Sequence, residues 1–232
     1  MSLLVVVPAR GGSKRLPGKN IRPLAGRSLL KHTADAIIES ALSTEVILTT
    51  DDDSIAAAGR ALDWLVPFRR PSSLATDDTP MFETVLHALD WYAHDRGGDP
   101  DQILLLQPTS PFRGGECLSE AARRLQSTPE ANSVIGMARL KVGASHVYSR
   151  DDAGFVRPVA QTQDRAAYVP NGALYLVRTK AFRQARTLFA PPIVSLEMDA
   201  FHAVDIDDAS DWALAEALIA ARLVEAGRDA AP

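Results

Sequence analysis

Short, continuous apolar runs alternate with longer amphipathic stretches through the first half of the chain. The runs cover residues 3–7, 46–48, 65–68 and 103–106, and the amphipathic stretches between them cover residues 29–42, 55–62 and 81–92. An apolar run without polar alternation is typical of a strand buried on both faces of a parallel sheet. Such strands alternating with helices predict repeated βαβ units, and hence an α/β fold with helices on both faces of a mainly parallel sheet.

A polar stretch interrupts this alternation, which then resumes. Residues 139–168 contain scattered glycines and few apolar runs, and we expect them to form an excursion from the sheet. After it, the pattern predicts a strand at 173–177, a helix at 180–186, a strand that ends at Asp207 and a final helix at 209–226. The 232 residues contain no internal repeat and no interdomain linker, so we expect one domain over residues 1–232.

Charge, cysteine content and hydropathy exclude several classes of function. A net charge of −4 gives no general attraction to nucleic-acid phosphates, so we expect no nucleic-acid partner. The single cysteine, Cys117, cannot form an internal disulfide, and no Cys/His cluster has zinc-site spacing. The apolar run at the N-terminus is too short for a signal peptide or a membrane span, so we expect a cytoplasmic protein with no membrane partner.

The segment that follows the first predicted strand is rich in glycine and basic residues. Residues 8–20 read PARGGSKRLPGKN, with three glycines and four cations. Glycine lets backbone N–H groups approach a ligand closely and the cations supply counter-charge, so this loop suits a triphosphate at the carboxyl end of the sheet. It matches neither the Walker A nor the GxGxxG pattern. A solvated basic turn is the alternative interpretation.

Two carboxylates, separated by one apolar residue, lie near the end of the chain. In the segment AVDIDD at 203–208, strand geometry would place Asp205 and Asp207 on one face, about 7 Å apart. Such a pair predicts a shared metal–phosphate cluster, because Mg²⁺ prefers one or two carboxylates together with phosphate oxygens. Alternatively, an acid here caps the final helix, and we assign that function to Asp208.

These segments together resemble a known family. In chain order the matching motifs are ARGGSK and PGKN at 9–14 and 17–20, TD at 50–51, RP at 70–71, LLQPTSPFR at 105–113, PNGA at 170–173 and DID at 205–207. They resemble the CMP-acylneuraminate synthetases and their CMP-legionaminate, CMP-pseudaminate and CMP-Kdo relatives over nearly the whole chain. The resemblance implies a single α/β, Rossmann-like nucleotidyltransferase domain with a mainly parallel sheet and a protruding dimerisation arm at 139–168.

The resemblance also implies roles for individual residues. It assigns Arg10, Gly11, Ser13, Lys19, Asn20 and Arg70 to the nucleotide, Gln107 and Asn171 to the sugar, and Asp205 and Asp207 to Mg²⁺, with Mn²⁺ as a substitute. Lys19 would neutralise charge at the reacting phosphate, so Lys19, Arg10 and Asp207 are the predicted catalytic residues. Lys14 and Arg15 are interpreted as charges at the rim. A surface salt bridge for Arg70 and a simple turn for Asn171 are the alternatives.

The sequence departs from this family in the arm. Members that activate sialic acid present a lysine and an arginine there to the sugar carboxylate, and these positions correspond here to His146 and Gln161. Neither residue is a permanent cation. Arg157 or Arg165 would supply the charge in a shifted alignment, so we count His146, Gln161 and Arg165 among the predicted substrate-binding residues. The resemblance further implies a homodimer in which the arm serves the neighbouring subunit.

The predicted activity is transfer of CMP from CTP to the anomeric hydroxyl of a small acidic α-keto sugar, such as a sialic-acid-like nonulosonic acid, with release of pyrophosphate. Kdo, or a non-sugar acid such as a phosphonate, is the alternative acceptor. A non-catalytic nucleotide-binding domain is an alternative of another class. The joint presence of Arg10, Lys19 and the two aspartates argues against it, because an idle domain has no need of a metal pair.

Overall fold

A six-stranded sheet forms the centre of the structure, a computed structural model that describes residues 2–159 and 165–229. Its strands are β1 (Leu3–Pro8), β4 (Glu45–Thr49), β5 (Gln102–Leu105), β6 (Ser133–Gly143), β9 (Ala166–Arg178) and β10 (Ile193–Met198), in the order β10-β6-β9-β5-β1-β4. β1 pairs parallel with β4 and β5, β6 pairs parallel with β10, and β9 is antiparallel to both of its neighbours. The prediction of a mainly parallel sheet is confirmed.

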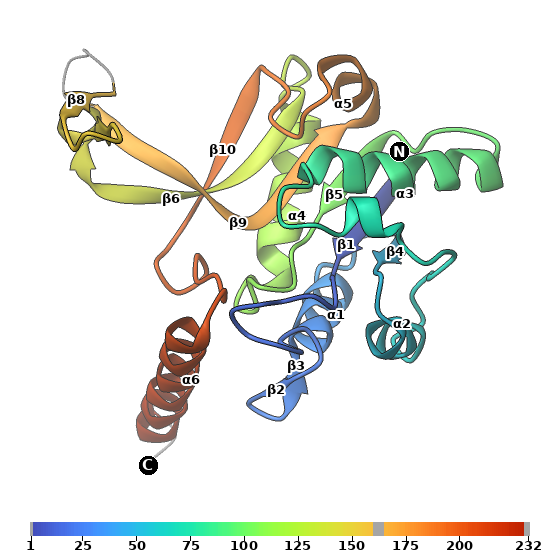
Figure 1. Cartoon of the computed structure of the whole chain (residues 1–232), viewed down its shortest axis with the longest axis horizontal. Coiled ribbons are helices and arrows are strands. Elements are labelled where there is room, and N and C mark those ends of the chain that lie inside the picture. The colour runs from blue at the N-terminus through green and yellow to red at the C-terminus, as the bar shows by residue number, and fades with distance from the viewer. Residues whose placement is uncertain (1, 160–164, 230–232) are drawn as a thin grey trace.

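Helices cover both faces of this sheet (Figure 1). They are α1 (Leu29–Glu39), α2 (Asp53–Arg60), α3 (Met81–Arg96), α4 (Gly115–Ser127) and α5 (Thr179–Ala185). The last helix, α6 (Ala209–Asp229), projects away from the sheet and packs near the start of α1. Alternate residues of β1 point to opposite faces: Val5 joins a buried cluster with Leu30 of α1 and Leu118 of α4. Val6 joins a second cluster with Val85 of α3 and residues of α5. The residues of β1 are therefore apolar throughout because both faces of the strand are buried, as expected.

Two predicted strands are not strands. Residues 65–68 contribute a single bridge, in which the N–H of Leu65 donates to the Val46 carbonyl and the N–H of Leu48 donates to the Leu65 carbonyl. Pro67 has no N–H, so the ladder cannot extend through it. Residues 203–207 form a loop instead of the predicted strand. The N–H of Ile206 donates to the Thr109 carbonyl at 2.8 Å, which ties this loop to the turn after β5.

The start of α6 follows the prediction. The Asp208 carboxylate accepts hydrogen bonds from the backbone N–H groups of Ser210 and Asp211 at 2.9 and 3.1 Å. In return, the Asp211 carboxylate accepts from the N–H of Asp208 at 3.0 Å. This reciprocal arrangement is a helix cap, so Asp208 has the capping role assigned to it. No helix in residues 2–159 and 165–229 is long and apolar enough to span a membrane.

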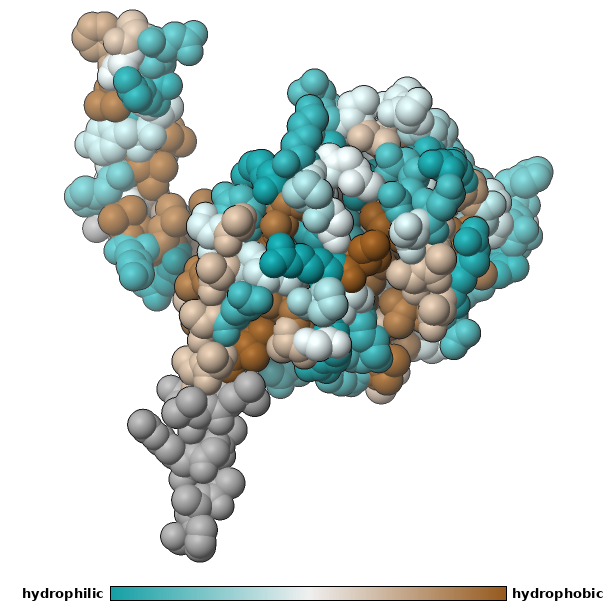
Figure 2. Space-filling view, turned by 60° about the horizontal axis from the view of Figure 1, so that its bottom comes forward, coloured by the Kyte–Doolittle hydropathy of each residue, from teal (hydrophilic) through white to brown (hydrophobic). Residues whose placement is uncertain are grey.

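The outer parts of β6 and β9 extend beyond the sheet as a two-stranded arm, described over residues 139–159 and 165–168 (Figure 1). Near its tip a hairpin forms from β7 (Tyr148–Arg150) and β8 (Val156–Pro158). The excursion predicted for this stretch is thus continuous with the sheet. The arm carries exposed apolar side chains, which appear as brown atoms at the upper left of Figure 2. Val142, Phe155, Val156 and Val159 are among these exposed residues, and the exposed aromatic ring of Tyr148 belongs to the same arm.

The contact between α1 and α4 depends on a glycine at the first position of α4. A Cβ atom on Gly115 would lie 2.5 Å from backbone atoms of Glu39 and Ser40, which cannot move aside as a flexible side chain would. We expect Gly115→Ala to lower the free energy of unfolding by about 1–3 kcal/mol, measured by urea titration. Gly114→Ala is the matched control, since its Cβ would meet nothing closer than 3.7 Å. Equal urea midpoints for the two variants would contradict this packing argument.

Candidate active site

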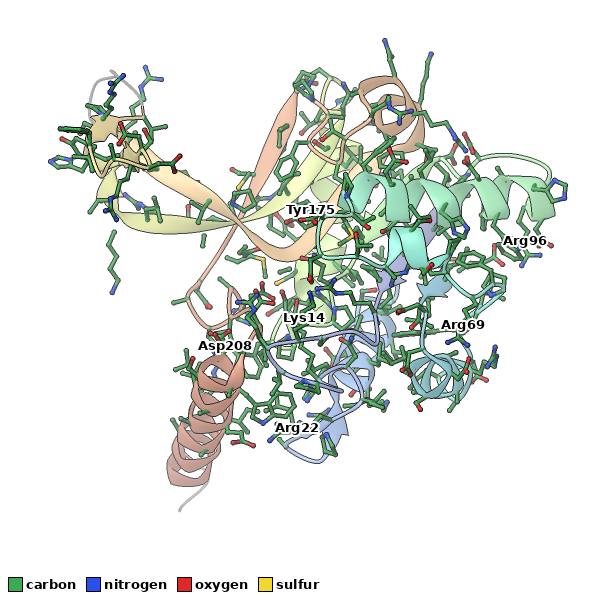
Figure 3. The ribbon with its side chains drawn as sticks, viewed as in Figure 1. Lys14, Arg22, Arg69, Arg96, Tyr175 and Asp208 are labelled. Carbon is green, nitrogen blue, oxygen red and sulfur yellow. The ribbon has the colours of Figure 1, made fainter. Side chains whose placement is uncertain are left out.

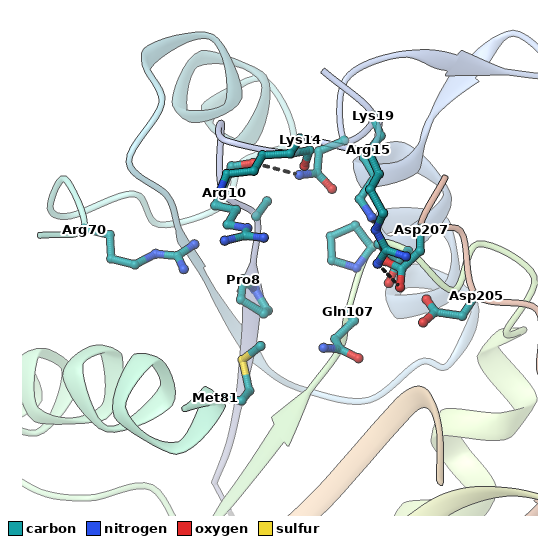
Figure 4. A pocket seen from close by; sticks show the side chains of 15 residues that line it. Pro8, Arg10, Lys14, Arg15, Lys19, Arg70, Met81, Gln107, Asp205 and Asp207 are labelled. Carbon is teal, nitrogen blue, oxygen red and sulfur yellow. Dashed lines mark hydrogen bonds and ion pairs between the residues drawn. The ribbon is translucent and has the colours of Figure 1, made fainter. Parts of the chain in front are cut away.

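An open cavity of about 270 Å³ lies at the carboxyl ends of β1 and β5 (Figure 4). This edge of the sheet is where ligands bind in open α/β folds. Eight of the residues singled out from the sequence line the cavity: Arg10, Ser13, Lys19, Asn20, Arg70, Gln107, Asp205 and Asp207. They come from segments far apart in the chain, and the fold brings them to one place.

Close backbone packing holds the basic loop against the turn after β4. The N–H of Gly11 donates to the Asp51 carboxylate at 2.9 Å. A Cβ on Gly11 would lie 2.8 Å from the side chain of Asp52, so only glycine fits here without displacing that acid. The Asn20 amide donates to the Arg10 carbonyl at 3.3 Å and closes the loop on itself. Gly11 shapes the loop and is not among the side chains that line the cavity.

The cations of the basic loop differ in exposure. Arg10 and Lys14 both pair with the carboxylate of Asp77, in the loop before α3. These two cations hold the pKa of the Asp77 carboxyl below its usual value. The Lys14 side chain, labelled in Figure 3, is 81% exposed. Lys14 and Arg15 are rim charges, as predicted, because both are largely exposed.

Lys19 is the buried cation of this loop, with 9% of its surface exposed. Its Nζ donates to the Ile206 carbonyl at 2.8 Å and to Asp207 Oδ1 at 3.0 Å. Arg15 donates to the other oxygen of the same carboxylate at 2.7 Å. Burial alone would raise the pKa of the Asp207 carboxyl, but Lys19 and Arg15 outweigh burial and lower it. The basic loop and the acidic loop are therefore joined in one charged cluster.

Asp205 lies deeper than Asp207 and has a different environment. Burial and the neighbouring Asp207 charge raise the pKa of the Asp205 carboxyl, whereas a hydrogen bond from Thr109 acts in the opposite direction. In the described part of the chain no three His, Cys, Asp or Glu side chains gather as a metal cage. Two carboxylates facing one cavity instead fit Mg²⁺, which takes its remaining oxygens from phosphates and water. The donor set is thus compatible with the predicted metal, although the strand geometry expected for it is absent.

Arg70 lies on the opposite side of the cavity (Figure 4). One Nη donates to the Thr49 carbonyl at 2.6 Å, and Nε is buried without a hydrogen-bond partner. Burial lowers its pKa to about 10, which leaves the guanidinium charged at neutral pH. Because a buried cation with an unused donor has a high desolvation cost, a ligand oxygen is a favourable partner for it. The interpretation of Arg70 as a surface salt bridge is wrong, because it is only 6% exposed.

Gln107 lines the cavity and packs closely against the turn at 171–172. Gly172 has φ +78°, and a Cβ there would lie 3.0 Å from Gln107 Oε1 and 3.6 Å from Asp205 Oδ2. Glycine is required at this position by both its backbone angle and this close approach. The Asn171 side chain accepts from the N–H of Ala173 and contacts the Met198 sulfur, so it does not line the cavity. Its role in sugar binding stays a prediction.

The structure does not bring the predicted arm residues to this cavity. The His146 ring contacts Ser145 Oγ at 3.0 Å in the arm, and Arg165 lies beside the 139–143 segment. Gln161 lies outside the described residues. Sequence reasoning missed Met81, which lines the cavity from the first turn of α3, and Thr109, which touches Asp205. The LLQPTSPFR motif contains Thr109 and could have identified it, whereas no local signal marks Met81.

Comparison with known proteins gives one consistent result. A family model described as cytidylyltransferase matches residues 4–228. A CMP-N,N'-diacetyllegionaminic acid synthase from Legionella pneumophila is 34% identical over 94% of this chain and 97% of its own length. An N-acylneuraminate cytidylyltransferase from Escherichia coli is 31% identical over 92% of this chain, which spans 51% of that longer relative.

A solved structure supports the fold independently. The structure of CMP:2-keto-3-deoxy-manno-octonic acid synthetase complexed with CTP superposes with a TM-score of 0.68. The match covers 96% of this chain and 100% of the solved one, at 19% sequence identity. The shared architecture therefore extends over nearly the whole chain.

Proposed function

We propose that this chain, which belongs to the cytidylyltransferase family, transfers CMP from CTP to the anomeric hydroxyl of a sialic-acid-like nonulosonic acid. Family membership makes the protein a CTP-dependent nucleotidyltransferase. The observation that carries the choice of acceptor is the similarity to the legionaminic acid synthase over 97% of that protein's length. The cavity supports the same conclusion, because it places buried cations and two carboxylates at the ligand-binding edge of the sheet.

In this reaction the acceptor oxygen bonds to the α-phosphorus of CTP while the bond to the bridging oxygen breaks and pyrophosphate leaves. Arg10, Ser13, Lys19 and Asn20 line the side of the cavity suited to the triphosphate. Lys19 can stabilise the negative charge that builds on the phosphates. Because the cation is already held in place, this stabilisation needs no reorganisation of the site during the reaction. Arg70, on the opposite side, would hold the nucleotide near its base.

The acidic loop would hold Mg²⁺ through Asp205 and Asp207, with Mn²⁺ as a substitute. When bound, the ion would neutralise phosphate charge during the transfer. The chain's own contribution is to hold both carboxylates in place. Thr109 bonds to Asp205, and Lys19 and Arg15 orient Asp207.

On the acceptor side, Gln107 lines the cavity and Gly172 packs closely against its amide, and the described residues of the same chain supply no arm cation to the cavity. We therefore assign the sugar carboxylate to arm residues of a neighbouring subunit, with His146 and Arg165 as candidates. Gln161 remains part of this assignment from the family resemblance alone. The proposal also includes a cytoplasmic location and no nucleic-acid partner, the latter because the net charge is −4.

We expect the protein to be a homodimer in solution. The arm exposes Tyr148, Phe155, Val156 and Val159 at 54–69% of their surfaces, an apolar cluster that a second copy would cover. Light scattering at micromolar concentration should give twice the chain mass of 25.0 kDa. Phe155→Asp should shift the population toward monomer, whereas Ile38→Asp, at an equally exposed apolar position on α1, should not. A monomeric parent protein would contradict the assignment.

The function is tested by measuring pyrophosphate release with CTP and a panel of acids. Legionaminic, N-acetylneuraminic and pseudaminic acids represent the nonulosonic acids, and Kdo and a simple phosphonate represent the alternatives. We expect turnover with at least one nonulosonic acid and with CTP in preference to UTP and ATP. Turnover restricted to Kdo or the phosphonate would refute the acceptor class and leave cytidylyl transfer intact. Binding of CTP without turnover of any acid would favour the non-catalytic alternative.

A further inference from the structure

Arg113 is a buried cation that none of the roles above uses. It ends the LLQPTSPFR motif and is 2% exposed. Within residues 2–159 and 165–229 it forms no ion pair, and its Nε has no hydrogen-bond partner. Burial lowers its pKa to about 9, although the charge of the nearby Asp205 acts in the opposite direction. A buried cation with no carboxylate at salt-bridge distance is costly, and an apolar side chain of similar size would often stabilise a fold as well or better. Stability alone is therefore a poor explanation for an arginine here.

The guanidinium joins three elements that meet under the cavity. One Nη donates to the Gln107 carbonyl at 2.7 Å and to the Ala173 carbonyl at 2.6 Å. The other Nη donates to Thr33 Oγ1 of α1 at 2.8 Å. The bond to Gln107 closes the turn at 107–113, and the bond to Ala173 fixes that turn to β9. The bond to Thr33 attaches the turn to α1, the helix that follows the basic loop.

These bonds fix the backbone that positions the side chains of Gln107 and Asp205 in the cavity. Gln107 carries an amide that lines the cavity, and Gly172, next to Ala173, lies between that amide and Asp205. The same turn presents the Thr109 carbonyl to the N–H of Ile206, the residue between the two aspartates. A shift of the turn at 107–113 would therefore move the amide and the acidic loop together.

We propose that Arg113 is a positioning residue that fixes the Gln107 amide and the Asp205 loop relative to one another through backbone carbonyls. It touches neither substrate nor metal in this assignment. The inference rests on the proposed function for its kinetic readout, but its geometric consequence can be measured without any acceptor.

Arg178 provides a matched control. It ends β9, the strand whose Ala173 carbonyl Arg113 contacts, and its guanidinium also donates to two backbone carbonyls, those of Ala131 and Leu125, at 2.8 and 2.9 Å. It lies at the end of β9 remote from the cavity. Loss of Arg178 should therefore cost backbone hydrogen bonds of the same kind without disturbing the site.

The kinetic test compares Arg113→Met, Arg113→Lys and Arg178→Met at a temperature at which circular dichroism shows each variant folded. We expect Arg113→Met to lower kcat/KM for the sugar acid about 100-fold, since a displacement of about 1 Å in a site can have that effect. Arg113→Lys keeps the charge and part of the donor set, so its loss should be smaller, about tenfold. Arg178→Met should stay within about threefold of the parent, because it leaves the site geometry intact.

A parent-like kcat/KM in folded Arg113→Met would overturn the proposal, as would an equal loss in Arg178→Met. If Arg113→Met does not fold, Arg113→Lys is compared with Arg178→Lys under the same criteria. Parent-like kinetics in Arg113→Lys would then refute the positioning role.

Hydrogen exchange separates this inference from the proposed function. In the parent, the N–H of Ser110 bonds to the Gln107 carbonyl and that of Ile206 to the Thr109 carbonyl. Both amides should exchange at least about tenfold faster in Arg113→Met, and in Arg113→Lys to a smaller extent, because their local opening becomes easier. They should be unchanged in Arg178→Met. Unchanged exchange in the Arg113 variants would overturn the proposal, whereas failure of the parent to use any sugar acid would refute only the acceptor assignment.

Discussion

Asp207→Asn is expected to reduce turnover by about 10²–10³-fold, or about 3–4 kcal/mol of transition-state stabilisation, while the fold is retained. The carboxylate faces the cavity and is held from two sides, by Lys19 at 3.0 Å and Arg15 at 2.7 Å. An amide in its place would bind a divalent cation weakly. The measurement is steady-state pyrophosphate release with CTP as Mg²⁺ is titrated after treatment with EDTA, and the parent should show no turnover before Mg²⁺ or Mn²⁺ is added.

Asp208→Asn is the matched control for this variant. It removes the same charge one residue away, and asparagine caps a helix about as well as aspartate, so α6 should keep its start and turnover should stay near that of the parent. The Mg²⁺ titration distinguishes two roles for Asp207. If it is a ligand, higher Mg²⁺ should recover part of the lost rate. If it only orients Lys19, the Mg²⁺ concentration for half-maximal rate should be unchanged, and the metal assignment would be wrong.

Local sequence patterns predicted most of the fold, because burial on both faces of a central sheet leaves a clear signal. The apolar runs at 3–7, 46–48 and 103–106 correspond to β1, β4 and β5, and the amphipathic stretches correspond to α1, α2 and α3. The run at 65–68 carries the same apolar signal but contains Pro67 and forms one bridge. Its apolar side chains are partly buried against the core without a strand ladder, and hydrophobic periodicity cannot distinguish that case from a strand.

The acidic loop shows a second limit of sequence patterns. Alternation of Asp205 and Asp207 suggested a strand, but the backbone between them bonds to Thr109 and the residues after them cap α6. The residues were predicted to lie at the site and do line the cavity, although the geometry given for them was wrong. The acidic motif thus predicted which residues lie at the site, whereas its backbone conformation depends on hydrogen-bond partners distant in the chain.

Contacts across long sequence separations explain what the sequence could not predict. Lys19 meets Asp207 across 188 positions, and Arg113 meets the Ala173 carbonyl across 60. No periodicity or propensity encodes such pairs. The basic loop could therefore be assigned to phosphate binding, whereas its attachment to the acidic loop, and the role of Arg113 beneath both, required the folded chain.

Lys19→Ala should lower the rate of the chemical step by a few kcal/mol, about 10²–10³-fold, because it removes one preorganised cation from the phosphate side of the cavity. Single-turnover experiments at saturating CTP isolate that step from binding and product release. Lys14→Ala removes the same charge five residues earlier in the same loop, but its side chain is 81% exposed and paired with Asp77. We therefore expect less than about a threefold change in the control, since exposed charges contribute little.

Circular dichroism should show both variants folded, although Lys19 also bonds to the Ile206 carbonyl and its loss should loosen the acidic loop. If only the KM for CTP rises in Lys19→Ala, the lysine binds the nucleotide equally in ground and transition states, and its assignment as a catalytic residue is wrong.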